Sequence, residues 1–185
     1  MEATRQLIEQ SQAKAVRLED IAKASGVSRQ TIYLHFGSRV DLMVATVQHI
    51  DEVNKFSERT QQLRDEVDSL GTMQLFIEFW ADYVPQIYGI AKQLLILRET
   101  DEGAAAAWKD RNSSLRNGPC RFLVERLERD GRLDPYWQID EAIDVLWALI
   151  SIQTWENLVI ERGWSRDEYT TKLKQMIQRV LIMKS

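Results

Sequence analysis

The chain has 185 residues, of which 44% are hydrophobic and 28% charged, and this composition is ordinary for a globular protein with a substantial core. Its formal net charge of −4 excludes a strongly basic protein, and its one cysteine, Cys120, excludes an internal disulfide. The longest apolar run, Val145–Ile150, is too short to span a bilayer, and no export signal is apparent. We therefore expect a cytoplasmic protein without a membrane partner.

The N-terminal part of the chain has the pattern of short helices. A first helix is expected over Ala3–Ser11, and two more are joined by a tight turn within Leu18–Arg39. Gly26 can adopt a positive φ at the end of the first helix of this pair, and Ser28 can cap the second. Two helices joined by a short turn with a glycine form a helix-turn-helix unit, whose second helix enters the major groove of DNA.

The expected recognition helix, Ser28–Phe36, has chemistry suited to DNA. Arg29 can pair with guanine, Gln30 with adenine, and Leu34 can contact a thymine methyl group. Hydroxyl groups on the same helix suit phosphate oxygens, and Arg39 can add charge where the next helix begins. The candidate DNA-binding residues are Ser28, Arg29, Gln30, Thr31, Tyr33, Leu34, His35 and Arg39.

The rest of the chain also has helical periodicity, without strand-like alternation, and we expect an all-α protein. Pro85 is expected to end or kink a helix, Gly118–Pro119 to interrupt another, and Ser165 with Glu168 to form a capping box. The expected helices of this part are Arg39–Glu66, Met73–Val84, Gln86–Arg98, Glu102–Arg129, Ile139–Ile160 and Ser165–Ile182.

The segment DIAKASGVSRQTIYLHFGSR, followed by Asp41 and Leu42, resembles the signature of the TetR family of bacterial transcriptional regulators. The resemblance is dense over Leu7–Val47, and ENLVIERGWSRDEY (Glu156–Tyr169) resembles a helix-loop-helix near the C-terminus of many such regulators. It implies a helix-turn-helix head over residues 1–47 and an effector-binding and dimerisation body over residues 48–185. The family's first helix usually begins earlier, so either the sequence lacks its natural N-terminus or this helix is short.

The resemblance also implies how the residues of the head are used. Thr31, Tyr33 and His35 would contact phosphates or the groove, whereas Arg29 and Gln30 would contact base edges. No serine or threonine precedes Leu18 to cap the second helix and touch a phosphate, which departs from the family pattern.

Two further sites in the helical body follow from the resemblance. A cavity would take a small hydrophobic or aromatic effector, although aromatic stripes at helical spacing also occur as plain core. Its candidate lining residues are Phe76, Phe79, Trp80, Tyr83, Tyr88, Trp108 and Trp147. The last two helices would pair with those of a second copy, unless their wide apolar faces are internal core. Candidate dimer residues are Ile143, Ile150, Leu158, Leu173, Ile177 and Val180.

No enzyme motif is found, and two histidines with one cysteine do not make a zinc-site pattern, so no catalytic residue, metal or cofactor is expected. The sequence predicts a homodimeric, TetR-like repressor that binds double-stranded operator DNA and is released by an unidentified small molecule. One alternative is a helical ligand-binding or interaction protein whose head no longer binds DNA. Another retains DNA binding but has a filled core and no effector.

Overall fold

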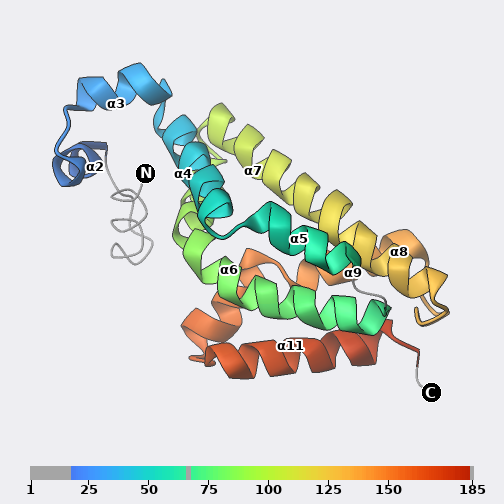
Figure 1. Cartoon of the computed structure of the whole chain (residues 1–185). Helices are drawn as coiled ribbons and strands as arrows, with labels where there is room; N and C mark the ends of the chain where they lie inside the picture. Colours follow the sequence, from blue (N-terminus) through green and yellow to red (C-terminus); the bar gives the residue numbers. More distant parts are fainter. Residues whose placement is uncertain (1–17, 66–67, 184–185) are drawn as a thin grey trace. The chain divides into compact units, whose positions relative to one another are not determined.

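The computed structural model describes residues 18–65 and 68–183, and the helix expected over Ala3–Ser11 lies outside these ranges. The described chain is all-α, with one isolated bridge between Leu133 and Ile182 and no strand in the parts described. Figure 1 shows the helices, which are α2 (Leu18–Ser25), α3 (Arg29–Phe36), α4 (Arg39–Val53), α5 (Phe56–Asp65), α6 (Ser69–Leu97), α7 (Glu102–Leu115), α8 (Arg121–Arg129), α9 (Ile139–Leu149), α10 (Ile152–Trp155) and α11 (Arg166–Leu181).

The helices form two compact units. Unit 1 contains the described residues up to Ser57 together with Pro85–Asp110, and unit 2 contains Glu58–Val84 and the described residues from Arg111 onward. Unit 1 is thus larger than a head of residues 1–47, because the second half of α6 and the first part of α7 belong with α4. Its buried apolar residues are Ile21, Ala22, Ile32, Val40, Leu42, Met43, Val47, Ile50, Ile90, Leu94 and Ala104.

The prediction of a single polar helix over Arg39–Glu66 is wrong, because this segment forms two helices, α4 and α5. α4 ends at Val53, and Lys55 has φ +51°, a left-handed conformation that interrupts the helix. The amide Nδ2 of Asn54 donates to the carbonyl of Ile50 at 2.8 Å, which satisfies an acceptor at the end of α4.

Pro85 does not end a helix, because α6 runs through it from Ser69 to Leu97. The two helices predicted on either side of the proline are therefore one. The proline nevertheless lies where α6 passes from unit 2 to unit 1. At Gly118–Pro119 the expected interruption is a wide π-helical turn, Arg116–Cys120, in which Arg121 N–H donates to the carbonyl of Arg116. This five-residue spacing accommodates the missing N–H of Pro119 without ending the helix.

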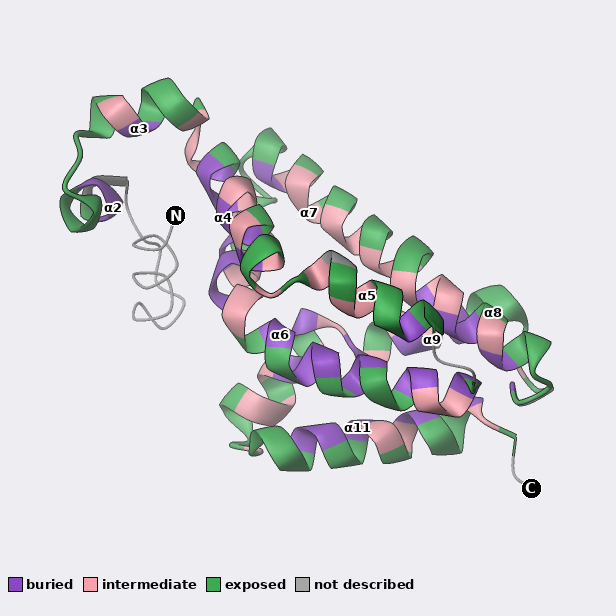
Figure 2. Ribbon diagram, viewed as in Figure 1, coloured by how far each residue is buried: buried purple, intermediate pink, exposed green. Residues whose placement is uncertain are grey.

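In unit 2, α11 packs its apolar stripe inward, as the burial pattern shows (Figure 2). The helix begins with the predicted capping box: Ser165 Oγ accepts from Glu168 N–H at 3.2 Å, and Ser165 N–H donates to Glu168 Oε2 at 2.9 Å. The helix predicted over Ile139–Ile160 is broken after Leu149, because Ser151 caps α10 by accepting from Thr154 N–H at 3.1 Å.

Among the described helices none is both long and apolar enough to cross a membrane by itself; the bent pair Ile139–Leu149 and Ile152–Glu161 meets the criterion by length and composition only.

Candidate nucleic-acid interface

The turn between α2 and α3 is built by a glycine with positive φ. Gly26 has φ +66°, and Val27 N–H donates to the carbonyl of Ala22 at 3.0 Å. This is the left-handed helix end that glycine adopts without strain. Ile21 and Ile32 are buried, so α2 and α3 share a small core, whereas Val27 lies at the surface rather than in that core.

α3 is capped at both ends, which defines where the helix begins and ends. Ser28 Oγ accepts from Thr31 N–H at 3.0 Å, with Ser28 in the extended conformation expected of an N-cap. At the other end Gly37 has φ +69°, and its N–H donates to the carbonyl of Tyr33 at 2.9 Å. The helix predicted over Ser28–Phe36 is therefore present, with Ser28 as its cap.

The face of α3 opposite its core is open to solvent. Leu34 is 79% exposed and Tyr33 46%, large values for apolar and aromatic side chains on a capped helix. Arg29 and Gln30 in the first turn are also exposed. Of the eight predicted DNA-binding residues, the six that are exposed are Ser28, Arg29, Gln30, Tyr33, Leu34 and His35.

Two predicted residues differ from these. Thr31 is half-buried, and its hydroxyl lies 2.8 Å from that of Ser28, so it supports the cap. Arg39 is also half-buried, and its Nη2 donates to the side-chain oxygen of Gln93 on α6. In the free protein this guanidinium is therefore engaged within unit 1 rather than open to a phosphate.

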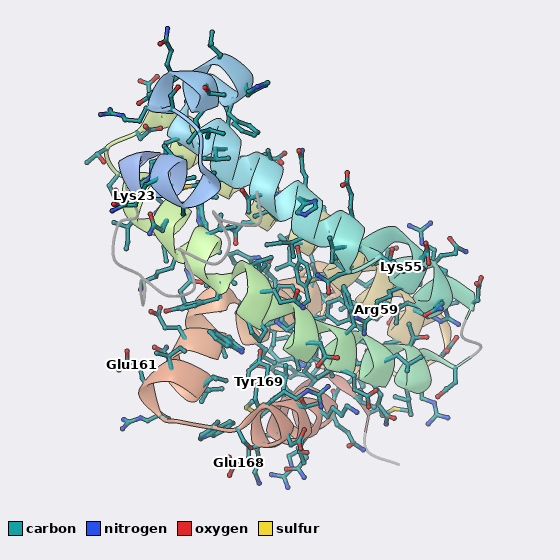
Figure 3. All side chains as sticks on the ribbon, turned by 60° about the vertical axis from the view of Figure 1, so that its left-hand side comes forward. Lys23, Lys55, Arg59, Glu161, Glu168 and Tyr169 are labelled. Atoms are coloured by element: carbon teal, nitrogen blue, oxygen red, sulfur yellow. The ribbon has the colours of Figure 1, made fainter. Side chains whose placement is uncertain are left out.

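Among the described residues of the head, Lys23 is a basic residue that was not a predicted contact. Lys23 lies in the last turn of α2 and is exposed, as Figure 3 shows. A lysine here adds positive charge to the same small head as Arg29. The sequence alone gave no reason to select it over other surface lysines, because its side of α2 is defined only once the packing is known.

The predicted effector residues are divided between the two units. Four of them are buried on the first half of α6 in unit 2, where the ring centroids of Phe76 and Trp80 lie 6.2 Å apart and those of Phe79 and Tyr83 5.5 Å apart. Tyr88 and Trp108 are half-buried in unit 1, and Trp147 is half-buried in unit 2. The four α6 residues are buried and pack ring against ring, as aromatic side chains of a protein core do.

The predicted dimer residues are mostly internal. The structure assigns four of the six to the core of unit 2 rather than to an outer surface, because their side chains are at most 1% exposed; these are Ile143, Ile150, Leu173 and Ile177. Leu158 is half-buried, and Val180 is 37% exposed. The alternation of apolar residues had shown which positions avoid water but not whether a neighbouring helix or a second chain covers them.

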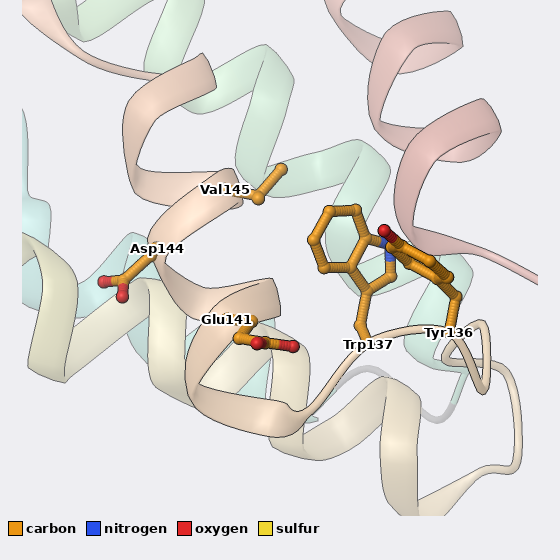
Figure 4. Close-up of a pocket in the computed structure, with 5 residues that line it drawn as sticks. All are labelled: Tyr136, Trp137, Glu141, Asp144 and Val145. Atoms are coloured by element: carbon orange, nitrogen blue, oxygen red, sulfur yellow. The ribbon is translucent and has the colours of Figure 1, made fainter.

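Unit 2 also carries a surface hollow of about 510 Å³, shown in Figure 4 and lined by Tyr136, Trp137, Glu141, Asp144 and Val145. Its two carboxylates already have partners. Glu141 accepts from the N–H of Gln138 at 3.1 Å, and Asp144 accepts from Nε of Arg116 at 2.6 Å. Glu141 thus caps a helix, and Asp144 forms an ion pair with Arg116. The hydrogen bond from Arg116 to Asp144 raises the pKa of Arg116.

Comparisons with known proteins agree with the geometry of the head. The sequence profile of the bacterial regulatory proteins of the tetR family matches residues 1–46. The HTH-type transcriptional regulator TtgR of Pseudomonas putida is 39% identical over 57 residues, which cover 31% of this chain and 27% of TtgR. The probable HTH-type transcriptional regulator ArpR of the same species is 37% identical over a match of the same length. These sequence matches span only about a quarter of either regulator.

Solved structures extend the likeness to the whole fold. A putative transcriptional regulator from Saccharomonospora viridis, in complex with choline, has a TM-score of 0.72 at 18% identity and covers 100% of both chains. NalD of Pseudomonas aeruginosa has a TM-score of 0.68 at 24% identity and covers 99% of this chain and 96% of its own. At these identities the likeness shows the fold, while the head supplies the sequence match. Residues 1–46 thus match the tetR family of bacterial regulatory proteins, and the chain as a whole has the fold of the solved regulators.

Proposed function

We propose that this protein regulates transcription as a homodimeric repressor, binding operator DNA through α3 and leaving it when a small hydrophobic or aromatic effector binds the helical body. The observation that carries the proposal is the exposed face of α3 within a segment that matches the tetR profile. A capped helix whose outward side chains are arginine, glutamine, tyrosine and an exposed leucine fits a groove that presents donors, acceptors and methyl groups.

The exposed residues divide into two roles. Arg29 and Gln30 are in the first turn of α3, the part of a recognition helix that meets base edges. Tyr33 carries a hydroxyl that suits a phosphate oxygen, and such contacts fix the position of the helix without reading sequence. Lys23 adds charge for the phosphate backbone.

A dimer is proposed because one helix reads only a few base pairs, whereas a symmetric pair reads two half-sites. With four of the predicted interface residues internal, the pairing surface would use what α9, the following turn and α11 leave uncovered. Apolar side chains of residues 139–183 that are half-buried or exposed include Ile139, Val145, Leu149, Leu158, Ile160, Met176, Val180 and Met183.

An effector is proposed from the aromatic side chains of the body. Trp80 and Trp147 are the candidates to contact one, because the indole Nε1 of each is buried and has no hydrogen-bond partner among the described residues. Such a donor could fix the orientation of an otherwise apolar molecule. Two relatives are consistent with small-molecule control: the Saccharomonospora viridis regulator was crystallised with choline, and NalD is the secondary repressor of a multidrug efflux pump.

Footprinting on the promoter that flanks the gene tests the proposal. A dimeric repressor should protect two half-sites whose centres are about 34–36 Å apart, one turn of DNA. A panel of small aromatic compounds, with choline as a polar comparison, should contain one that quenches tryptophan fluorescence and removes the footprint. A footprint that every compound leaves in place would favour the variant without an effector. No footprint on promoter or genomic fragments would favour a ligand-binding protein with a head that no longer binds DNA.

A further inference from the structure

Arg39 joins the start of α4 to the second half of α6 within unit 1. It is the first residue of α4, directly after the N-cap Ser38, and its Nη2 donates to the side-chain oxygen of Gln93. Gln93 is only 2% exposed, so the acceptor is part of the core. The chain separates the two residues by 54 positions, and the contact is therefore a tertiary one.

The partner of Arg39 is neutral, which makes this contact weak for a guanidinium. No carboxylate among the described residues pairs with Arg39, and its Nε is buried without a hydrogen-bond partner. Burial lowers the pKa of Arg39, in keeping with a charge that is partly removed from water and has no paired anion. A phosphate would instead be an anionic acceptor for the same group, so both partners would be charged, and the planar guanidinium can donate two parallel hydrogen bonds to it.

A second polar contact holds the other end of α4 to the same half of α6. Asn54 and Gln86 exchange two amide hydrogen bonds, of 2.9 and 3.1 Å. Gln86 and Gln93 are seven residues apart and thus lie on one face of α6. α4 is therefore tied to this half of α6 at its start by Arg39 and at its end by Asn54, and only the first tie involves a charge.

We propose that Arg39 is a positioning residue that exchanges Gln93 for a phosphate of operator DNA, so that Gln93 and the DNA compete for one guanidinium. The inference rests on the proposed operator binding and adds a route for its regulation. A shift of the second half of α6 that strengthens the Arg39–Gln93 contact withdraws a phosphate contact, and a shift that breaks it releases one.

Operator binding of substituted full-length chains, titrated by fluorescence anisotropy at several salt concentrations, tests the competition. Gln93→Glu gives Arg39 an anionic partner inside the protein. It should weaken binding about tenfold at 0.1 M salt and flatten the slope of log affinity against log salt by about 0.9, the effect of one lost phosphate contact. Gln86→Glu is the matched control, because it adds the same charge on the same face of α6 but next to Asn54, and it should keep the wild-type slope.

Two further variants keep the test valid if Gln93→Glu does not fold, which circular dichroism would show. Gln93→Leu removes the competitor, and should tighten binding about 3- to 10-fold with the wild-type slope. Arg39→Gln should flatten the slope by about 0.9, and adding Gln93→Leu to it should change neither the slope nor the affinity further.

The outcomes separate this inference from the proposed function. Specific operator binding by the wild type, combined with equal slopes for Gln93→Glu and Gln86→Glu, contradicts the competition and leaves the regulator intact. Wild-type affinity in Gln93→Leu contradicts it as well. A wild-type chain without specific DNA binding overturns both proposals.

Discussion

At the scale of single residues, the turn between α2 and α3 depends on neighbours along the chain, whereas the contact of Arg39 depends on a residue 54 positions away. The roles of Gly26 and Ser28 depend on residues within one helical turn, and the structure has the glycine at positive φ and the serine as N-cap. The surroundings of Arg39 depend on Gln93, which no local pattern connects to it. The residue chemistry could thus be predicted, but the partner that holds Arg39 in the free protein could not.

Base reading by α3 gives a prediction for Gln30. Replacing this exposed glutamine by alanine should reduce discrimination between operator and mutated operator by about 1–3 kcal/mol, because a bidentate contact to adenine is lost. The salt dependence should remain that of the wild type, since no phosphate contact changes. Anisotropy titrations with both duplexes measure this, and Gln61→Ala, at an exposed position of α5, serves as the control. Equal discrimination by Gln30→Ala and the wild type would remove Gln30 from the base contacts.

Cys120 gives a prediction about pH and reactivity. Its thiol is fully buried, and burial raises the pKa of Cys120 to about 12. At pH 8 only about one thiol in ten thousand is then ionised, and the thiolate is the reactive form. The folded protein should resist a disulfide reagent at pH 8, and the chain unfolded in guanidinium should react promptly with one equivalent. Rapid reaction of the folded protein would contradict this burial.

At the scale of helices, the local capping signal of α11 was reliable, whereas the breaks at Lys55 and after Leu149 were not predicted. The capping box of α11 was predicted from Ser165 and Glu168 and is confirmed. The break at Lys55 was missed, because lysine at positive φ has no signal in the sequence. Pro85 was expected to end or kink a helix, but a proline whose ring is compatible with helical φ removes one hydrogen bond without ending α6.

Removing the cap of α11 should destabilise unit 2. Ser165→Ala loses the acceptor for Glu168 N–H and should lower the free energy of unfolding by about 1 kcal/mol, as N-cap substitutions commonly do. Urea denaturation followed by circular dichroism measures this difference. Ser114→Ala, at an exposed position inside α7, is the matched control and should be neutral or slightly stabilising. A loss of the same size in both variants would show that the cap contributes nothing specific.

The same cap predicts a pH dependence. The backbone N–H and the hydroxyl of Ser165 bond to the Glu168 carboxylate and lower its pKa. A carboxyl whose pKa is lower in the folded state stabilises the protein above its ordinary pKa, and this contribution disappears as the pH falls through the lowered value. Glu168→Gln should therefore have a flatter stability profile than the wild type in the acid range. Parallel profiles would contradict the role of the charged cap.

At the scale of the whole molecule, the all-α class could be predicted because helical periodicity is continuous along the chain. The division into units could not, because the second half of α6 and the first part of α7 join α4 through contacts distant in sequence. The dimer surface could not be predicted for the same reason. Hydrophobic spacing identified the apolar stripe of α9 and α11, but most of this stripe is buried inside unit 2.

The proposed dimer predicts different outcomes for two equal substitutions at exposed valines. Val180→Asp introduces a carboxylate on the outer side of α11 and should raise the dimer dissociation constant at least about tenfold, since an unpaired charge would be buried in the interface. Val53→Asp, at an exposed position of α4, should leave the dimer unchanged. Analytical ultracentrifugation over a concentration series measures both. A Val180→Asp chain that dimerises like the wild type would place the interface elsewhere.

The measurement that tests the central claim most directly is a fluorescence-anisotropy titration of the wild-type chain with the flanking promoter and with random duplex, at two salt concentrations. A regulator of this kind should bind the promoter at least about a thousandfold more tightly than random DNA, with an affinity that falls steeply as salt rises. Weak binding of equal strength to both duplexes would contradict it, because the exposed face of α3 would then read no sequence.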